Sequence, residues 1–304
     1  MSKPEPHGSK LKALLVNSKL PSTDKPRVQQ AIEKYEQLKL DLDSLENLET
    51  LLEDKVNLIN AYKKHIDFEL IYNSPNDFLY RQNGQLKLSN SILEEFIPYF
   101  VDQRLVPGLT HVTDLTHGSK SSFSGLSFGG SIQPLNRGGV FLKVKDQDFA
   151  LAKKHKITIE EVANSENKFT KDFDVAYFAA EIKTNLDKTM FQEASQTANE
   201  LKIAVTGSKY LLLCEYLDMT PINTKLTAID EVIILRQAKR LSSNIRDRFS
   251  TVAGRQGYAS EYEKFLDDNP LSLSSFQRLV NHIKEAFPES LEIDQNQVLR
   301  RGYF

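Results

Sequence analysis

Glu181 and Lys183 lie two residues apart in an otherwise apolar run, residues 173–189, with Asp174 seven residues before the glutamate. If the run is a strand, residues two apart project from the same face, so the glutamate and the lysine point together. Burying opposite charges in an apolar sheet costs several kcal/mol per ion unless the charges are paired or bound to metal. The pair is therefore either a structural salt bridge or part of a site that handles charge.

Phosphodiester hydrolysis is the chemistry that these residue types favour. It needs a cation to neutralise charge on the phosphate, and an activated water. Mg²⁺ is typically held by one or two carboxylates together with phosphate oxygens and waters. We expect Asp174 and Glu181 to bind Mg²⁺ with the backbone carbonyl of Ile182, and Lys183 to orient or deprotonate the attacking water.

For both acids to bind one metal ion, the chain between them must bring their carboxylates close together. Seven residues of straight strand span roughly 23 Å, which is too long for two carboxylates to share one metal ion. We therefore expect the segment to fold back or bulge between Asp174 and Glu181, with Asp172 as the alternative acid. Gln192 and Glu193, at the start of the following helical pattern, are candidates for support of the site.

The elements that must position these residues follow from hydrophobic periodicity. Apolar residues recur every three to four positions across 24–66, which predicts one long or two successive amphipathic helices, and a further helix is predicted over 89–101. There Glu94 and Glu95 either add an accessory carboxylate or lie on a solvated face. The Gly/Ser-rich segment 116–139 contains no nucleotide-binding motif and is expected to be a flexible loop, or to lie along a phosphate backbone.

From residue 140 the pattern becomes strand, strand, helix, strand, strand, with runs such as VFLKV, VAYFAAEIK, YLLLCEYL and EVIIL. This order predicts a mixed α/β protein with a central sheet flanked by helices. We expect a helical N-terminal region, residues 1–110, that supports DNA binding or dimerisation. The α/β core would then span residues 111–304, with a basic helix and a C-terminal helix.

Composition narrows the class of protein. The 304 residues carry a formal net charge of −2, which argues against a protein that coats nucleic acid by bulk attraction but not against a site-specific one. A single cysteine, Cys214, gives no disulfide framework, and no apolar run reaches the roughly 18 residues that span a membrane. We expect a cytoplasmic protein.

Positive charge is concentrated in residues 236–248, which carry five Lys or Arg residues against one acid. On a helical wheel four of these basic residues share one face, which predicts a helix that contacts DNA phosphates: Arg236, Lys239, Arg240 and Arg246. A solvated basic face is the alternative. In the segment 253–258, read as a glycine-flanked loop, Arg255 and Gln256 are residue types that bond base edges in the major groove, although a plain surface turn fits equally well.

The pattern of Asp174, Glu181 and Lys183, followed by a helix and another strand, resembles the PD-(D/E)xK nuclease core, with Phe173 where the motif's name has Pro. EIKTNLDKTMFQEA followed by KYLLLCEYLDMTP resembles the central block of the Bpu-type restriction endonucleases. PHGSKLKALL and DKPRVQQAIEKY resemble their beginning. This resemblance implies a type II restriction endonuclease of a restriction-modification system, with Asp174, Glu181 and Lys183 as its Mg²⁺-dependent catalytic set.

The resemblance also implies the substrate and the assembly. Such enzymes read a short interrupted duplex sequence of the CCTNAGC kind, and because that site is asymmetric, two related subunits pair and each cuts one strand. Whether this chain forms a homodimer or a heterodimer stays open. Two other functions also remain open: a DNA repair or junction nuclease with the same core, and a DNA-binding subunit without catalysis, in which Glu181 and Lys183 are merely structural.

Overall fold

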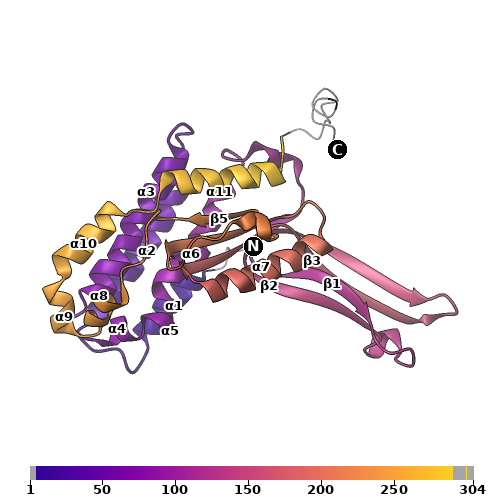
Figure 1. The fold of residues 1–304 in the computed structure, drawn as a ribbon, viewed down its shortest axis with the longest axis horizontal. Helices are drawn as coiled ribbons and strands as arrows, with labels where there is room; N and C mark the ends of the chain where they lie inside the picture. Colours follow the sequence, from indigo (N-terminus) through magenta and orange to yellow (C-terminus); the bar gives the residue numbers. More distant parts are fainter. Residues whose placement is uncertain (1–4, 290–298, 300–304) are drawn as a thin grey trace.

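The fold is taken from a computed structural model, which describes residues 5–289 and residue 299. Helices fill the first third of the chain, and a sheet begins at Leu115 (Figure 1). The helices that matter for the site are α1 (Pro6–Leu15), α2 (Lys25–Asp43), α3 (Leu51–Lys64), α4 (Phe78–Arg81), α5 (Asn83–Leu86) and α6 (Leu88–Phe96). No helix in the described part of the chain is long and apolar enough to cross a membrane.

The amphipathic pattern across 24–66 forms two successive helices, which is one of the two arrangements expected from the sequence. On α2 the residues at helical spacing are the buried ones: Val28, Ala31, Tyr35, Leu38 and Leu42. The next helix continues directly into a π-helical stretch, His65–Tyr72, whose side chains are mostly buried. The N-terminal helices therefore pack by the apolar face that the sequence indicates.

The described residues form one five-stranded sheet in the order β1-β2-β3-β4-β5. Its strands are β1 (Leu115–Phe128), β2 (Val140–Glu161), β3 (Asn164–Leu186), β4 (Lys209–Leu217) and β5 (Glu231–Ile234). The first three strands pair antiparallel in sequence, and β3, β4 and β5 run parallel. This confirms the expected mixed α/β sheet flanked by helices.

Helix α7 (Lys188–Ala204) connects the parallel strands β3 and β4 as a crossover. Asp187 caps its start by accepting a hydrogen bond from the backbone N–H of Met190 at 2.9 Å. Phe191, Ala194 and Ala198 then bury one helical face against the sheet. This is the helix that the sequence pattern predicts.

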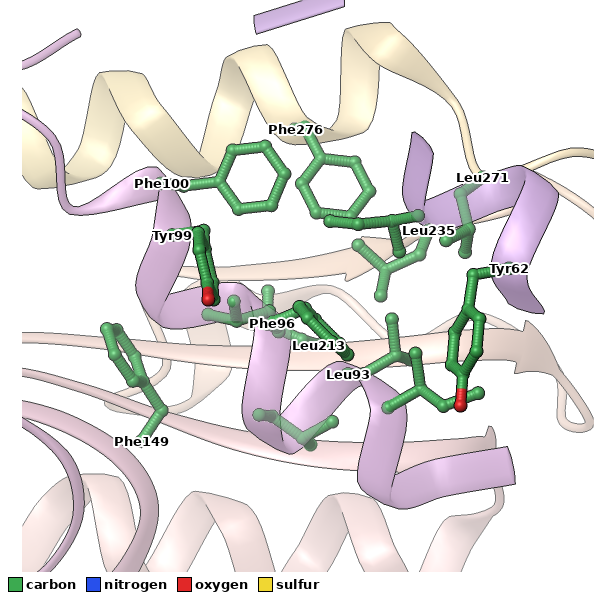
Figure 2. Packing of buried hydrophobic residues seen from close by; sticks show 14 of the residues in the cluster. Tyr62, Leu93, Phe96, Tyr99, Phe100, Phe149, Leu213, Leu235, Leu271 and Phe276 are labelled. Atoms are coloured by element: carbon green, nitrogen blue, oxygen red, sulfur yellow. The ribbon is translucent and has the colours of Figure 1, made fainter. Parts of the chain in front are cut away.

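Two hydrophobic clusters cover the two faces of the sheet. The larger cluster joins the N-terminal helices to the sheet and to α11 (Leu273–Ala286). Figure 2 shows part of it, where Phe100 and Phe276 meet above Phe96 and Leu213. The second cluster lies under α7, and charged side chains that project on that face must find partners within a largely apolar surface.

One expectation about the strands is wrong, and a second holds in only one of its two forms. The Gly/Ser-rich segment is not a loop up to Phe128, because β1 pairs residue by residue with β2 over most of its length. The chain also does not fold back between Asp174 and Glu181, because β3 runs unbroken from Asn164 to Leu186. The alternative, a bulge between the two acids, is present as a register shift at Tyr177, but β3 continues through it and the two acids stay apart.

Candidate active site

Glu181 and Lys183 lie on β3, and their side chains form an ion pair with 2.7 Å between the glutamate Oε1 and the lysine Nζ. Their neighbours Ala180 and Ile182 belong to the larger hydrophobic cluster on the other face. The two charged side chains remain 21% and 29% exposed, so the pair lies at the surface rather than sealed in the core. The strand alternation read from the sequence therefore places these two groups together.

Asp148 of β2 is the acid that joins this pair. Its Oδ2 lies 3.8 Å from the Nζ of Lys183 and accepts a hydrogen bond from the backbone N–H of Ile182 at 2.8 Å. The antiparallel register of β2 and β3 pairs Phe149 with Ala180, so Asp148 comes to the level of Glu181. Two carboxylates and one ammonium group thus converge from two adjacent strands.

A bulge in β2 lies at Asp148. Between Gly118 and Lys120 on β1, the partner on β2 changes from Ala150 to Gln147, so β2 contributes one extra residue there. Bulges change the direction in which a side chain projects, and they are frequent beside active sites. We attribute the approach of Asp148 to the backbone of Ile182 to this local irregularity.

The surroundings shift the pKa values of Asp148 and Lys183. Burial raises the pKa of Asp148, and the charges of Glu181 and Glu94 raise it further, against the lowering effects of the Ile182 N–H and of Lys183. Burial by itself lowers the pKa of Lys183, but its hydrogen bond to Glu181 and the charge of Asp148 outweigh burial, so the pKa lies above its ordinary value. Lys183 is therefore an ammonium group at neutral pH.

The structure does not bring Asp174 to this cluster. Asp174 lies seven residues before Glu181 on the same unbroken strand, where it pairs in register with Lys154 and Ser122. The strand stays extended because AYFAA holds no turn residue and is paired with β2. Asp172, the alternative acid, lies still further away, with its carboxylate 3.9 Å from Lys156. The acid beside Lys183 comes from β2 instead.

A cleft of about 290 Å³ opens beside Asp148. Its wall is formed by residues from α1 and its N-terminal flank, α6 and the short helix that follows it, and β1: Glu5, Pro6, Ser9, Glu94, Pro98, Gly118 and Ser119.

Asn90 of α6 donates to Glu94 at 2.7 Å and accepts from Thr184, the residue after Lys183, at 3.2 Å. Lys10 lies 3.6 Å from Glu94. Glu94 therefore faces the same cleft as Asp148.

Glu95 does not lie on a solvated face, contrary to one reading of the sequence. It is buried, and its Oε2 accepts hydrogen bonds from the backbone N–H groups of His7 and Gly8 at 2.7 and 3.1 Å. These N–H groups belong to the first turn of α1, which has no partner within its own helix for them. Glu95 of α6 thus caps α1 and holds that helix in place as part of the wall of the cleft.

The donor set at Asp148 and Glu181 fits a hard divalent cation. Among the residues that the structure describes, no group of three or more His, Cys, Asp or Glu side chains could hold a metal ion. Mg²⁺ needs fewer protein ligands than such a group supplies, because one or two carboxylates usually suffice with waters and substrate phosphate. Asp148, Glu181 and the carbonyl of Ile182 are oxygen donors of the kind that could hold such an ion.

The two accessory candidates on α7, Gln192 and Glu193, are both exposed. Glu193 contributes its backbone carbonyl to the hydroxyl of Thr197 within the helix, at 3.1 Å. The hydrogen bond to the Glu181 carboxylate comes instead from a residue that the sequence analysis missed. Tyr210 of β4, buried beneath α7, donates its phenol hydroxyl to Oε2 of Glu181 at 3.1 Å.

The basic helix predicted for residues 236–249 is wrong in its first half. The chain from Arg236 to Leu241 is not helical, since Leu217 donates to the carbonyl of Ala238 and accepts from the N–H of Arg240. Helix α8 covers only Ser243–Arg248. The wheel therefore groups residues that do not share a helical face.

Arg236 is only 5% exposed, and its guanidinium is paired inside the protein. Its Nε donates to Glu215 at 2.6 Å, and a second nitrogen lies 3.5 Å from Asp67. Lys63 completes this buried network, 3.1 Å from both acids. As it lies in this structure, Arg236 joins β4 to the π-helical stretch and cannot face DNA.

Arg255 is likewise buried, at 2% exposure, and its segment is not a loop but helix α9 (Val252–Gly257). Its guanidinium donates to the backbone carbonyls of Tyr72, Phe249 and Asn76. Gln256, the other candidate for base readout, is exposed. The guanidinium of Arg255, which suggested base readout in the sequence analysis, instead holds α9 against the π-helical stretch.

The other basic residues of this region remain accessible. Lys239 is exposed, Arg240 pairs with Asp218 at 3.0 Å, and Arg246 donates to the carbonyl of Leu241. Two arginines that the wheel did not include lie close by. Arg248 is exposed, and Arg81 of α4 donates to the carbonyl of Ser250 at 3.0 Å. These five residues are called the α8 basic surface below.

Comparison with known proteins assigns the family. The profile of the Bpu10I restriction endonuclease family matches residues 85–304. Three chains of solved structures match the fold, and one of them is from the native BbvCI A2B2 tetramer, with a TM-score of 0.58 and 17% sequence identity over 91% of this chain and 94% of that chain. No curated protein sequence matches. Because the family profile covers most of the chain, the protein belongs to the Bpu10I restriction endonuclease family.

Proposed function

We propose that this chain is a type II restriction endonuclease, or one subunit of such an enzyme, that hydrolyses DNA phosphodiester bonds with Mg²⁺. The observation that carries the proposal is the convergence of Asp148, Glu181 and Lys183 at the base of the β2–β3 hairpin, in a chain of a restriction endonuclease family. Two carboxylates beside a charged lysine are the groups that metal-assisted phosphodiester hydrolysis requires.

Each residue has a defined part in this proposal. Asp148, Glu181 and the Ile182 carbonyl would hold Mg²⁺, which supplies charge neutralisation at the phosphate and an acidified water when it is bound. Lys183 carries its proton at neutral pH, so it acts as a donor that orients the attacking water or offsets phosphate charge. The same raised pKa argues against Lys183 as the base that deprotonates the water.

We also propose that the site is a PD-(D/E)xK site in which Asp148 takes the part that sequence reasoning gave to Asp174. In this arrangement the first acid lies on one strand, and Glu181 and Lys183 lie on the next strand of an antiparallel hairpin. The two acids are then close although they are far apart in sequence. No fold-back of β3 is then needed to bring two carboxylates to one metal ion.

Double-stranded DNA and a second subunit are the proposed partners. The α8 basic surface supplies cations for phosphate contacts, which position a duplex without reading its sequence. The matched BbvCI structure is an A2B2 tetramer, and this supports a proposal that the present chain pairs with a related subunit or with itself. A short interrupted site of the CCTNAGC kind is the proposed target.

Plasmid cleavage by the purified protein tests this function. We expect cuts at one short sequence with Mg²⁺, or nicks in one strand if a sister subunit is absent, and mapping of the ends gives the site. Cleavage of branched or mismatched DNA without sequence preference would favour a repair or junction nuclease. Specific binding with no cleavage under any metal or partner condition would favour a non-catalytic subunit.

A further inference from the structure

Tyr210 is the second residue of β4, and its position is fixed from several sides. The side chain is fully buried in the cluster under α7. Its backbone N–H donates to Oδ2 of Asp230 at 2.7 Å, and its carbonyl accepts from the N–H of Asp230 at 2.9 Å. Lys202 of α7 pairs with the same carboxylate at 2.7 Å. The phenol ring therefore has little freedom to move.

The hydroxyl of this fixed ring reaches Glu181. Tyr210 donates to Oε2 of the glutamate at 3.1 Å, while Oε1 pairs with Lys183 at 2.7 Å. Each carboxylate oxygen thus has its own partner, so rotation of the carboxylate about its last bond would break one of the two contacts. Burial, and then the charge of Glu181, raise the pKa of the Tyr210 phenol, so the hydroxyl keeps its proton and remains a donor.

Carboxylates that bind metal ions are commonly held by such outer hydrogen bonds, which set their orientation. We propose that Tyr210 is a positioning residue of the cleavage site, whose hydroxyl holds Glu181 in the orientation needed to bind the divalent cation together with Asp148. This inference rests on the proposed function. It adds a residue on β4 to a site that otherwise comes from β2 and β3.

A purely structural role makes a different prediction. A buried phenol needs a hydrogen-bond partner wherever it lies, and Glu181 would then be only a convenient acceptor. Removal of the hydroxyl would lower stability in either case. Only a positioning role would also weaken the binding of a metal ion, so metal affinity separates the two interpretations.

The test compares Tyr210→Phe with Tyr72→Phe in the full-length chain. Tyr72 is a matched control because it is equally buried and its hydroxyl donates to the carbonyl of Arg255 at 2.9 Å, away from the carboxylates. Mn²⁺ binding is measured by titration calorimetry without DNA, and the Mg²⁺ concentration for half-maximal plasmid cleavage is measured in parallel. Thermal unfolding reports the stability cost of each change.

We expect Tyr210→Phe to weaken Mn²⁺ binding about tenfold and to raise the Mg²⁺ requirement similarly, since outer-sphere partners typically contribute 10- to 100-fold to metal affinity. Tyr72→Phe should leave both quantities unchanged. Wild-type Mn²⁺ affinity in Tyr210→Phe, in an assay where Glu181→Gln abolishes binding, overturns this inference alone. If wild type and Glu181→Gln bind Mn²⁺ equally, the proposed metal site itself is overturned.

Discussion

Asp148 and Ile182 are tied across two strands by a hydrogen bond of 2.8 Å from the backbone N–H of Ile182 to the aspartate Oδ2. The bond places the Asp148 carboxylate beside the segment that carries Glu181 and Lys183. It joins the acid to the backbone between those two residues rather than to a flexible side chain. The geometry of the candidate site is thus set by strand pairing and by one bulge in β2.

Two conservative substitutions distinguish Asp148 from Asp174 as the catalytic acid. Asp148→Asn should reduce the rate of DNA cleavage by at least about 100-fold, because loss of a ligand should exceed the 10- to 100-fold effects of outer-sphere partners. Asp174→Asn is the matched control, and cleavage should remain near the wild-type rate because Asp174 lies far along β3. Plasmid cleavage under single-turnover conditions measures both. If Asp174→Asn lost cleavage and Asp148→Asn kept it, Asp174 would be the catalytic acid.

Asp148→Asn should also stabilise the fold at neutral pH. Its folded pKa is raised, chiefly by burial, so the ionised carboxylate destabilises the folded state above that pKa. As the pH falls through the folded pKa, the wild-type acid becomes protonated and this cost disappears. Thermal unfolding should therefore show a higher midpoint for Asp148→Asn at pH 7, and a smaller difference toward pH 4. An equal difference at both pH values would contradict the assigned cause.

Local spacing was enough to find two of the three charged residues of the candidate site. Glu181 and Lys183 are two residues apart on one strand, and the period of a strand places them together without any knowledge of the fold. Asp148 could not be found in that way, because its proximity depends on the pairing of β2 with β3 and on a bulge. The one available signal was the pair of acids shortly after the VFLKV run, Asp146 and Asp148, and the sequence alone does not choose between them.

The fold shows the same division between local and long-range information. Helices α2, α3 and α7 were predicted because their buried faces repeat within a few residues. Strand β1 was missed because serine and glycine have low intrinsic strand preference, and only its pairing with β2 makes it a strand. Arg236 and Arg255 were wrongly predicted to contact DNA for a similar reason. Their partners inside the protein come from distant parts of the chain, which the local sequence does not show.

Gly8→Ala should displace α1 from its place beside the cleft. A Cβ at Gly8 would lie 2.5 Å from the hydroxyl oxygen of Tyr35 and 2.6 Å from a ring carbon, which is too close for any side chain. We expect a loss of about 1–3 kcal/mol in the free energy of unfolding, as for overpacked cores. Gly84→Ala is the control, because a Cβ there meets no atom within 4 Å. Denaturant unfolding measures both, and equal effects would contradict the tight contact.

Arg236 and Arg246 were grouped by sequence as DNA-contacting residues, and the structure separates them. Arg236→Ala would leave Glu215 and Asp67 without their guanidinium partner in the buried network, and breaking such a pair typically costs about 3–5 kcal/mol of folding stability. Arg246→Ala removes a partly exposed cation of the α8 basic surface, so stability should stay near the wild-type value. Denaturant unfolding of the two variants measures this difference.

DNA binding provides the second half of the same comparison. If Arg246 contacts a phosphate, Arg246→Ala should weaken binding about equally for all duplex sequences and reduce the salt dependence of log K by roughly one contact. Arg240→Ala should behave likewise, because the ion pair with Asp218 is accessible to solvent and exposed pairs of this kind are weak. Fluorescence anisotropy with duplex DNA across a range of salt concentrations gives the slope. An unchanged slope in both variants would mean that the duplex lies elsewhere on the protein, because a phosphate contact cannot be removed without releasing fewer counterions.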